Sequence, residues 1–261
     1  MGRPVMCLIL FACQCHPQYP LIIAGNRDEY HTRPAAPAHF WEEAPHVLAG
    51  KDLQAGGTWF GITRNGRIAA LTNYRDPAST KKNAPSRGEL VRRFLMEKAS
   101  PGAFLRRLEQ KADSYNGFNL VFGIKDELYW YSNRNHGRVR LKSGLHGLSN
   151  HLLDTPWPKV RRGKKALAGL LSEKRDIRSE PLFQVLSDTT RAEDPHLPNT
   201  GIGIKWERHL SPIFIAGSAY GTRASYVVVM DHADHVLFTE KTFDPQHTQS
   251  GTVRFEFQLR P

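Results

Sequence analysis

The sequence predicts an α+β fold with largely antiparallel sheets. Strand-like runs occur in pairs joined by short turns, helical segments lie together between those pairs, and strand–helix–strand alternation does not recur. Hairpins grouped in this way are typical of antiparallel sheets packed against helices, whereas regular alternation would indicate a parallel sheet. The 261 residues, 40 % of them hydrophobic, can fill one sizeable core. We therefore expect a single domain over residues 1–261.

The chain opens with two predicted hairpins. Residues 6–13 and 19–26 are apolar runs, and the segment QCHPQ between them has the proline and polar residues of a turn. Residues 58–63 and 67–72 form the second pair, and Asn65-Gly66 supplies the residues that tight hairpin turns prefer. Antiparallel strands are thus expected to dominate the N-terminal part of the chain.

Two helices are expected next. Ser86 and Glu89 have the spacing of a capping box ahead of residues 90–99. Ser100-Pro101 offers an N-cap and a first-turn proline to residues 102–112. Both signals place helix starts directly after polar loops.

The second half of the sequence returns to strands, then helices, then strands. The first strands are expected at 119–124, 128–131 and 139–142, followed by a helix over 157–171 and a short one over 181–187. The last strands, separated by Gly-, Asp- and His-rich turns, are expected at 213–216, 226–230, 236–239 and 253–259.

The formal charge of +11 favours a ligand with anionic groups. Its densest cluster, which a solvated helix face explains, comprises Lys159, Arg161, Arg162, Lys164 and Lys165. No zinc-finger spacing or aromatic RNA-binding motif accompanies the cluster, so nucleic acid is not an expected partner. No apolar run approaches the roughly 20 residues of a membrane span. We expect a cytoplasmic protein without a membrane span.

All cysteines lie between positions 7 and 15, which is a poor disulfide framework for a chain of this length. Cys13 and Cys15 lack the second Cys/His pair that a zinc site needs, so we expect reduced thiols and no metal site. Met6 directly before Cys7 indicates a different role for this cysteine, as an N-terminal residue. If residues 1–6 are a removable or mis-assigned extension, Cys7 becomes the first residue and carries both a thiol and a free amine.

Arg27 and Asp28 follow the second predicted strand. Charge at a strand end is most often the chain reaching water, but here both side chains could reach back toward Cys7. Arg27 would stabilise a thiolate by its charge, and Asp28 would accept a hydrogen bond from the α-amine.

Asn73 and Asn150 each close a strand-like run and precede a polar turn. That position is common for a structural asparagine, yet a side-chain amide there can also donate to a developing oxyanion. Arg223 stands after Gly221-Thr222 at the start of a late strand.

Several segments resemble the NRDE family, also called the transport and Golgi organisation protein 2 family. They are Met6-Cys7 with its strand, NRDE at 26–29, GGTWFGITRNGRIAALTNYR at 56–75, GLSNHLLDTPWPKV at 147–160 and GTRASYVVV at 221–229. They follow family order across most of the chain, which is therefore identified as a member with one NRDE-type domain.

That family is similar to the cysteine branch of the N-terminal nucleophile hydrolases, which contains penicillin V acylase and conjugated bile salt hydrolase. The resemblance implies a four-layer αββα sandwich of two antiparallel sheets between helix layers. It also implies a cysteine nucleophile exposed by methionine removal, a linear, non-peptide C–N amide as substrate, and no required cofactor. The implied site residues are Cys7, Arg27, Asp28, Asn73, Asn150 and Arg223.

In the implied mechanism the α-amine takes the thiol proton and the thiolate attacks a carbonyl. Asn73 and Asn150 would stabilise the oxyanion, and Arg27 and Arg223 would orient the thiolate. The acylases separate their Arg from their Asp, whereas Arg27 and Asp28 are adjacent here. Since neighbours on a regular strand point to opposite faces, either the strand bends after Gly25 or only one of the two serves the site.

Two further functions stay open at this point. The NRDE family is also associated with haem trafficking and acyl-lipid metabolism, so the chain could hold such a ligand without turnover. The basic charge balance suits haem propionates or a CoA phosphate, and His16 and His31 are candidate iron ligands without distinctive spacing. The other alternative is a scaffold at secretory membranes, for which the sequence offers no anchor.

Overall fold

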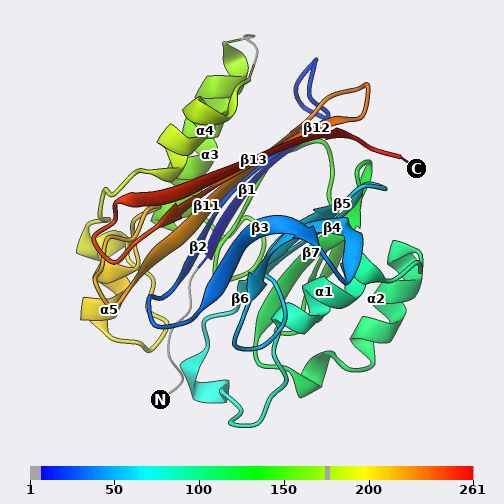
Figure 1. Cartoon of the computed structure of the whole chain (residues 1–261). Helices are drawn as coiled ribbons and strands as arrows, with labels where there is room; N and C mark the ends of the chain where they lie inside the picture. Colours follow the sequence, from blue (N-terminus) through cyan, green and yellow to red (C-terminus); the bar gives the residue numbers. More distant parts are fainter. Residues whose placement is uncertain (1–6, 174–176, 261) are drawn as a thin grey trace.

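Two antiparallel sheets lie face to face, and helices cover the outer face of each (Figure 1). The structure, a computed structural model, describes residues 7–173 and 177–260. The extension expected over residues 1–6 lies outside this range.

The first sheet contains the chain's first two strands and its last three. Its order is β10 (Gly144–Leu148), β1 (Cys7–Cys13), β2 (Leu21–Tyr30), β11 (Tyr220–Met230), β12 (His235–Phe243) and β13 (Gln249–Gln258). The second sheet is sequential, with β3 (Ala35–Trp41), β4 (Ala44–Asp52), β5 (Phe60–Thr63), β6 (Arg67–Asn73), β7 (Phe118–Ile124), β8 (Glu127–Ser132) and β9 (Arg138–Arg140).

The helices divide between the two outer faces. Helices α1 (Gly88–Met96) and α2 (Pro101–Glu109) pack on the second sheet, and α3 (Pro158–Ser172) and α4 (Ser179–Leu186) pack on the first. The short α5 (Ile204–His209) and the 3₁₀ turns Pro77–Ser79, Ala112–Ser114 and Asp194–His196 lie in the connections. The expected αββα sandwich is therefore confirmed.

Strand β1 shows how the layers form, because its residues alternate between two cores. Leu8 and Leu10 pack with α3 and α4 on the outer face. Ile9 and Phe11 point the other way, into the core between the sheets. With a side-chain period of two, Cys7 also faces the second sheet.

The expected hairpins and all four expected helices are present. β1 pairs with β2 and β5 pairs with β6, both antiparallel. Ser100 caps α2, since its hydroxyl accepts from the Ala103 N–H at 3.3 Å. The capping box expected from Ser86 is wrong: the N-cap of α1 is Arg87, and no side chain caps that helix.

The strand expected at 213–216 is wrong. This segment is apolar because it is buried, with Ile213 and Ile215 almost fully enclosed, but its hydrogen bonds are irregular. The Ile213 carbonyl accepts from the Asn26 side chain, and the Ile215 N–H donates to the Thr222 hydroxyl. A buried run with side-chain partners has the same sequence signature as a buried strand.

Several elements were not expected from the sequence. β3 carries Pro37, and its pairing with β4 shifts register across that residue. Because β3 is an edge strand of its sheet, the missing N–H of proline is tolerated there. β4 and α5 are weakly patterned or short, so periodicity alone does not reveal them. The strand-like run that Asn150 closes is present as β10. None of the helices in the described ranges is long and apolar enough to span a bilayer.

Glu240 on β12 joins the two sheets. Its carboxylate accepts from the Ala38 N–H of β3 at 2.8 Å and is almost completely buried. Burial raises the pKa of Glu240 to about 7, against the lowering effects of that hydrogen bond and of Arg27. The folded state therefore binds this proton more tightly than the unfolded state does.

A Glu240→Gln variant is expected to gain stability relative to the wild type as pH rises from about 4.5 to about 7. Below that range the wild-type carboxyl is protonated and carries no burial penalty. Above it the penalty is complete and on the order of 3 kcal/mol. Urea unfolding across pH measures the difference, and a difference that stays constant from pH 5 to 8 would contradict the assignment.

Candidate active site

Cys7 begins β1 on the wall of a cavity of about 290 Å³. The strands contribute Cys7, Arg27 and Asn73 to the wall, Trp59 lines it from just before β5, and residues 84–88 close it from the side of α1. The cavity thus lies between the two sheets, where one end of β1 meets the ends of β2 and β6.

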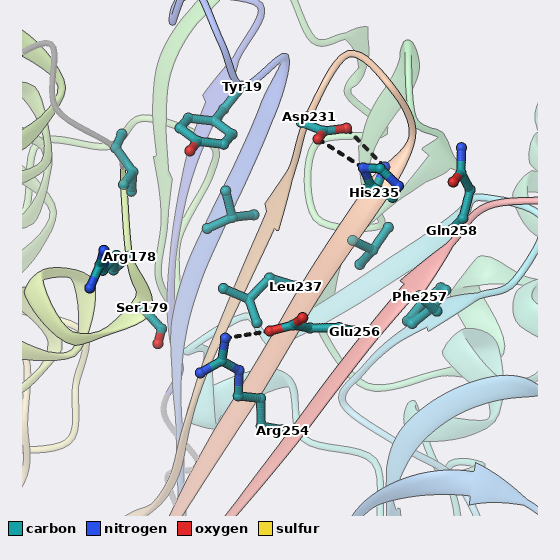
Figure 2. Close-up of a pocket in the computed structure, with 13 residues that line it drawn as sticks. Tyr19, Arg178, Ser179, Asp231, His235, Leu237, Arg254, Glu256, Phe257 and Gln258 are labelled. Atoms are coloured by element: carbon teal, nitrogen blue, oxygen red, sulfur yellow. Dashed lines mark hydrogen bonds and ion pairs between the residues drawn. The ribbon is translucent and has the colours of Figure 1, made fainter.

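A larger groove of about 810 Å³ lies on the outer side of β12 and β13 (Figure 2). Two pairs of its residues contact each other: Arg254 pairs with Glu256, and Asp231 holds His235 at 3.2 Å. Cys7 is not among its lining residues. We therefore place the candidate site at the smaller cavity.

The four residues of the NRDE segment divide between the two faces of β2. Asn26 points to the helix side, where its amide donates to the Leu186 and Ile213 carbonyls at 2.9 Å and its oxygen accepts from Ser225. Arg27 is the cross-strand partner of Cys7 and shares its face. Glu29, two positions on, lines the same cavity.

Asp28 extends to the face opposite Arg27, since β2 continues through both residues without a bend. One carboxylate oxygen of Asp28 accepts from the Thr222 hydroxyl at 2.6 Å. The other oxygen is buried and has no hydrogen-bond partner among the described residues. The irregularity lies on the neighbouring strand, where β11 shifts register between Thr222 and Ala224.

A lysine lies beneath Asp28. Lys159 of α3 is 2 % exposed, and its amine has no hydrogen-bond partner among the described residues. Burial raises the pKa of Asp28 to about 6, and Lys159 opposes that rise. Burial likewise lowers the pKa of Lys159 to about 8, and Asp28 opposes it. The expected solvated helix face is therefore wrong for Lys159, which belongs to the buried charges under the site.

Asn150 and Asn73 connect the site to the ends of β10 and β6. The Cys7 N–H donates to Asn150 Oδ1 at 3.3 Å, and Asn150 Nδ2 donates to the Asn73 carbonyl at 2.7 Å. The Asn73 side chain lines the cavity and makes no hydrogen bond within the described ranges. Of the two amides, Asn73 is thus the one presented to a ligand, while Asn150 holds the nitrogen of Cys7.

Arg223 is not among the residues that line the cavity. Its NH1 group donates to the carbonyls of Tyr30, His31 and Arg33 at 3.0 to 3.1 Å. It therefore holds the loop after β2, which positions Arg33 at the cavity wall. The structure brings Cys7, Arg27, Asn73 and Asn150 together and places Arg223 one layer behind them. Asp28 also lines the cavity, and its main chain contacts the Cys7 thiol.

The Cys7 thiol is protonated at neutral pH in this form of the chain. Burial raises its pKa to about 12, and the charge of Asp28 acts in the same direction. A hydrogen bond from the Asp28 main chain and the charge of Arg27 lower the pKa, but by less. A buried thiol in this state is inert unless a nearby base removes its proton.

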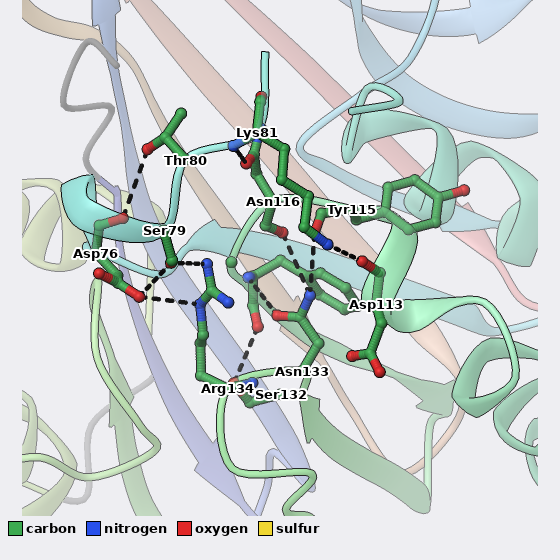
Figure 3. Close-up of polar contacts among 12 residues, drawn as sticks. Asp76, Ser79, Thr80, Lys81, Asp113, Tyr115, Asn116, Ser132, Asn133 and Arg134 are labelled. Atoms are coloured by element: carbon green, nitrogen blue, oxygen red, sulfur yellow. Dashed lines mark hydrogen bonds and ion pairs between the residues drawn. The ribbon is translucent and has the colours of Figure 1, made fainter. Parts of the chain in front are cut away.

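The loop over residues 76–87 contributes to the wall of the cavity. Polar contacts hold the first part of this loop (Figure 3). The Lys81 N–H donates to Asn116 Oδ1 at 2.7 Å, and Asn116 Nδ2 donates back to the Lys81 carbonyl at 3.1 Å. Arg134 contacts Asp76 and Ser79 at the start of the same loop. These contacts hold residues 76–81, and residues 84–88, which follow them in the chain, line the cavity.

The candidate iron ligands lie away from the cavity. His16 sits in the turn between β1 and β2, where its Nδ1 accepts from the Gln18 and Tyr19 N–H groups. His31 lies in the loop after β2 and does not line the cavity. Within residues 7–173 and 177–260, no cluster of three His, Cys, Asp or Glu side chains could hold a metal ion.

Comparison with known proteins agrees with this architecture. A family model described as Transport and Golgi organisation 2 matches residues 6–245. The Transport and Golgi organization protein 2 homolog of Bos taurus is 36 % identical over 276 residues, covering 97 % of this chain and 100 % of that protein. The Homo sapiens homolog is 33 % identical over 276 residues, with the same coverage of both chains.

A solved structure of a conjugated bile acid hydrolase variant from Clostridium perfringens has a similar fold. Its TM-score is 0.53 at 8 % identity, and the match covers 97 % of this chain and 92 % of that one. At this level of identity the similarity concerns the fold, and it agrees with the sandwich described above.

Proposed function

The chain belongs to the Transport and Golgi organisation 2 family, and we propose that it is a cysteine amidohydrolase of the N-terminal nucleophile type. Its substrate class is a small molecule with a non-peptide C–N amide bond. The observation that carries the proposal is Cys7 at the start of β1, with its thiol on the cavity wall and its nitrogen 3.3 Å from Asn150 Oδ1. The similarity to a bile acid hydrolase in fold is consistent with it.

The active form begins at Cys7, because only a free α-amine can act as the base. The amine takes the Sγ proton, the thiolate bonds to the carbonyl carbon, and the oxygen receives the displaced electron pair. Asn73 donates to that oxygen, Asn150 orients the amine, and Arg27 stabilises the thiolate. The ammonium then protonates the leaving nitrogen as the C–N bond breaks, and water releases the acyl group.

A non-catalytic ligand-binding protein, for haem or an acyl lipid, is the second candidate. It is favoured by the raised pKa of Cys7 when the nitrogen is part of a peptide bond, since such a thiol does not attack. The cavity of about 290 Å³ is at the lower end of the range for small-molecule sites, which favours a compact ligand over a macrocycle. The unpaired thiols suit the reducing cytoplasm in either case.

Removal of residues 1–6 is expected to activate Cys7. In protein that starts at Cys7, iodoacetamide should modify Cys7 faster than Cys13 or Cys15, with an apparent pKa below the ordinary value of about 8.5. In the full chain Cys7 should be the slow residue, because its nitrogen cannot accept a proton. Peptide mass analysis across pH measures all three thiols, and intact mass of native protein shows which form exists.

Cys15 is the internal control, because it is exposed in the same molecule. If Cys7 is no faster than Cys15 in protein that starts at Cys7, the hydrolase proposal fails. A saturable Soret change on adding haem would then support the binding protein.

A further inference from the structure

Three guanidinium groups line the Cys7 cavity, and two of them are paired with carboxylates. Arg33 lies 2.6 Å from Asp52 and 3.8 Å from Glu29. Arg27 lies 3.9 Å from Glu29, and its guanidinium stacks 4.3 Å from the ring centre of Trp59. These two arginines are therefore held by the wall itself.

Arg87 is the third, and its contacts differ from those of the other two. Its NH1 group donates to the Gly117 carbonyl at 3.0 Å, and within the described residues it makes no ion pair. Burial lowers the pKa of Arg87 to about 10, while the thiolate of Cys7 and the carboxylate of Glu29 act against that decrease. A half-buried charge without a partner is costly unless a ligand completes it.

The backbone holds Arg87 firmly in place. It is the N-cap residue of α1, and the start of that helix packs directly against the rim of the second sheet. A Cβ atom on Gly57 would lie 2.5 Å from the carbonyl carbon of Gly88, so the two segments are in closest contact. The loop contacts through Asn116 fix the neighbouring turn that accepts from Arg87 (Figure 3).

We propose that Arg87 anchors a compact anionic group, carboxylate or phosphate, on the ligand that enters the Cys7 cavity. A guanidinium presents parallel N–H donors that match either anion. Glu29 lines the same cavity, but no carboxylate of the described residues forms an ion pair with Arg87. The inference deepens the proposed function by giving the amide substrate an anionic group close to the reacting carbonyl. Binding at Arg87 can be measured without turnover.

The test is an NMR titration of the full chain with sodium acetate or inorganic phosphate at constant ionic strength. Saturable shifts are expected at the amides of Cys7, Gly88 and Gly117. Arg87→Gln should weaken binding at least about tenfold, and Arg87→Lys, which keeps the charge but loses the fork, should fall between. Arg208→Gln is the matched control, because Arg208 is exposed and pairs with Asp194.

The dissociation constants of acetate and phosphate are compared, and the anion that binds more tightly shows whether the site prefers a carboxylate or a phosphate group. Shifts that do not saturate, or that Arg87→Gln leaves unchanged, would overturn the inference. Unfolding curves of both Arg87 variants show whether a lost response comes from lost structure. If Arg87→Gln does not fold, Arg87→Lys decides, and wild-type affinity in that variant counts against bidentate anchoring.

A second measurement links the anion to the thiol. In protein that starts at Cys7, iodoacetate and iodoacetamide differ only in charge near the reacting carbon, and both form an S–C bond with loss of iodide. We divide the rate with iodoacetate by the rate with iodoacetamide at Cys7 and normalise this quotient to the same quotient at Cys15. It should be at least about 5 in the unsubstituted protein and about 1 in Arg87→Gln. Rapid reaction with both reagents but no preference would reject Arg87 and keep the hydrolase. No reaction at Cys7 would reject the hydrolase, while the titration still decides on Arg87.

Discussion

Cys7→Ala is expected to slow amide hydrolysis by at least about a thousandfold, since the variant lacks the atom that forms the acyl bond. The cavity and the amine remain, so substrate should still bind. The measurement has two parts: hydrolysis of an amide selected from a library, and mass detection of an acyl group on the Cys7 peptide of the wild type. Both should vanish together in the variant.

Cys15→Ser serves as the comparison for this variant, because Cys15 lies in the exposed turn beyond β1 and outside the cavity. It should hydrolyse the same amide at the wild-type rate. Turnover that survives in Cys7→Ala would mean that another group performs the chemistry, and the assignment of the nucleophile would have to be abandoned.

Arg75→Met is expected to destabilise the fold by about 3 to 5 kcal/mol, because it leaves the buried carboxylate of Glu207 without its cationic partner. Arg75 forms an ion pair with Glu207 of α5, and both side chains are about 5 % exposed or less. The other oxygen of Glu207 accepts from the Thr200 N–H and hydroxyl at 2.9 and 2.6 Å. The melting temperature should fall on the order of 10 °C.

The double variant Arg75→Met/Glu207→Met should recover much of that loss, because both charges are then absent. Arg208→Met on the same helix is the matched control, since its pair with Asp194 is solvent-exposed. Its melting temperature should stay close to that of the wild type. Equal losses at Arg75 and Arg208 would show that burial does not set the cost of these pairs.

Much of the architecture follows from local sequence. Asn65-Gly66 predicts the hairpin between β5 and β6, and Ser100-Pro101 predicts the start of α2, because those turns and caps depend on the residues themselves. The segment at 213–216 misled because burial and strand formation both select apolar residues. Ser86 misled because the capping-box spacing alone does not fix the helix start: Arg87 is the N-cap of α1, and no side chain caps the helix.

The site was harder to predict than the fold. The resemblance, together with their positions at strand ends, predicted Cys7, Arg27, Asn73 and Asn150, and the structure brings these residues close together. The opposite orientations of Arg27 and Asp28 follow from the strand period, but the partners of Asp28 do not. Lys159 looked like part of a solvated basic cluster, although it directly precedes Val160 on the face that packs against β1 and β10.

No sequence signal pointed to Arg87, because the role proposed for it depends on the lack of an ion-pair partner for it among the described residues. Its sequence neighbours, Ser86 and Gly88, indicate only a loop and a helix start. The missing carboxylate partner becomes visible only when the loop, the turn at Gly117 and the rim of the cavity are brought together.

Because the side chains of β2 alternate between its two faces, the four residues of the NRDE segment at 26–29 have different surroundings. Arg27 and Glu29 line the cavity, and the Asn26 side chain binds the Leu186 carbonyl behind the strand. Asp28 also lines the cavity, while its carboxylate accepts from Thr222 of β11. Substitutions at Arg27 and Glu29 can therefore change ligand preference while Asn26 keeps its contacts behind the strand. A register error of one residue would exchange the two faces and bury Arg27 where Asn26 now binds backbone carbonyls. The NRDE segment thus helps to specify the register in which β2 pairs within the first sheet.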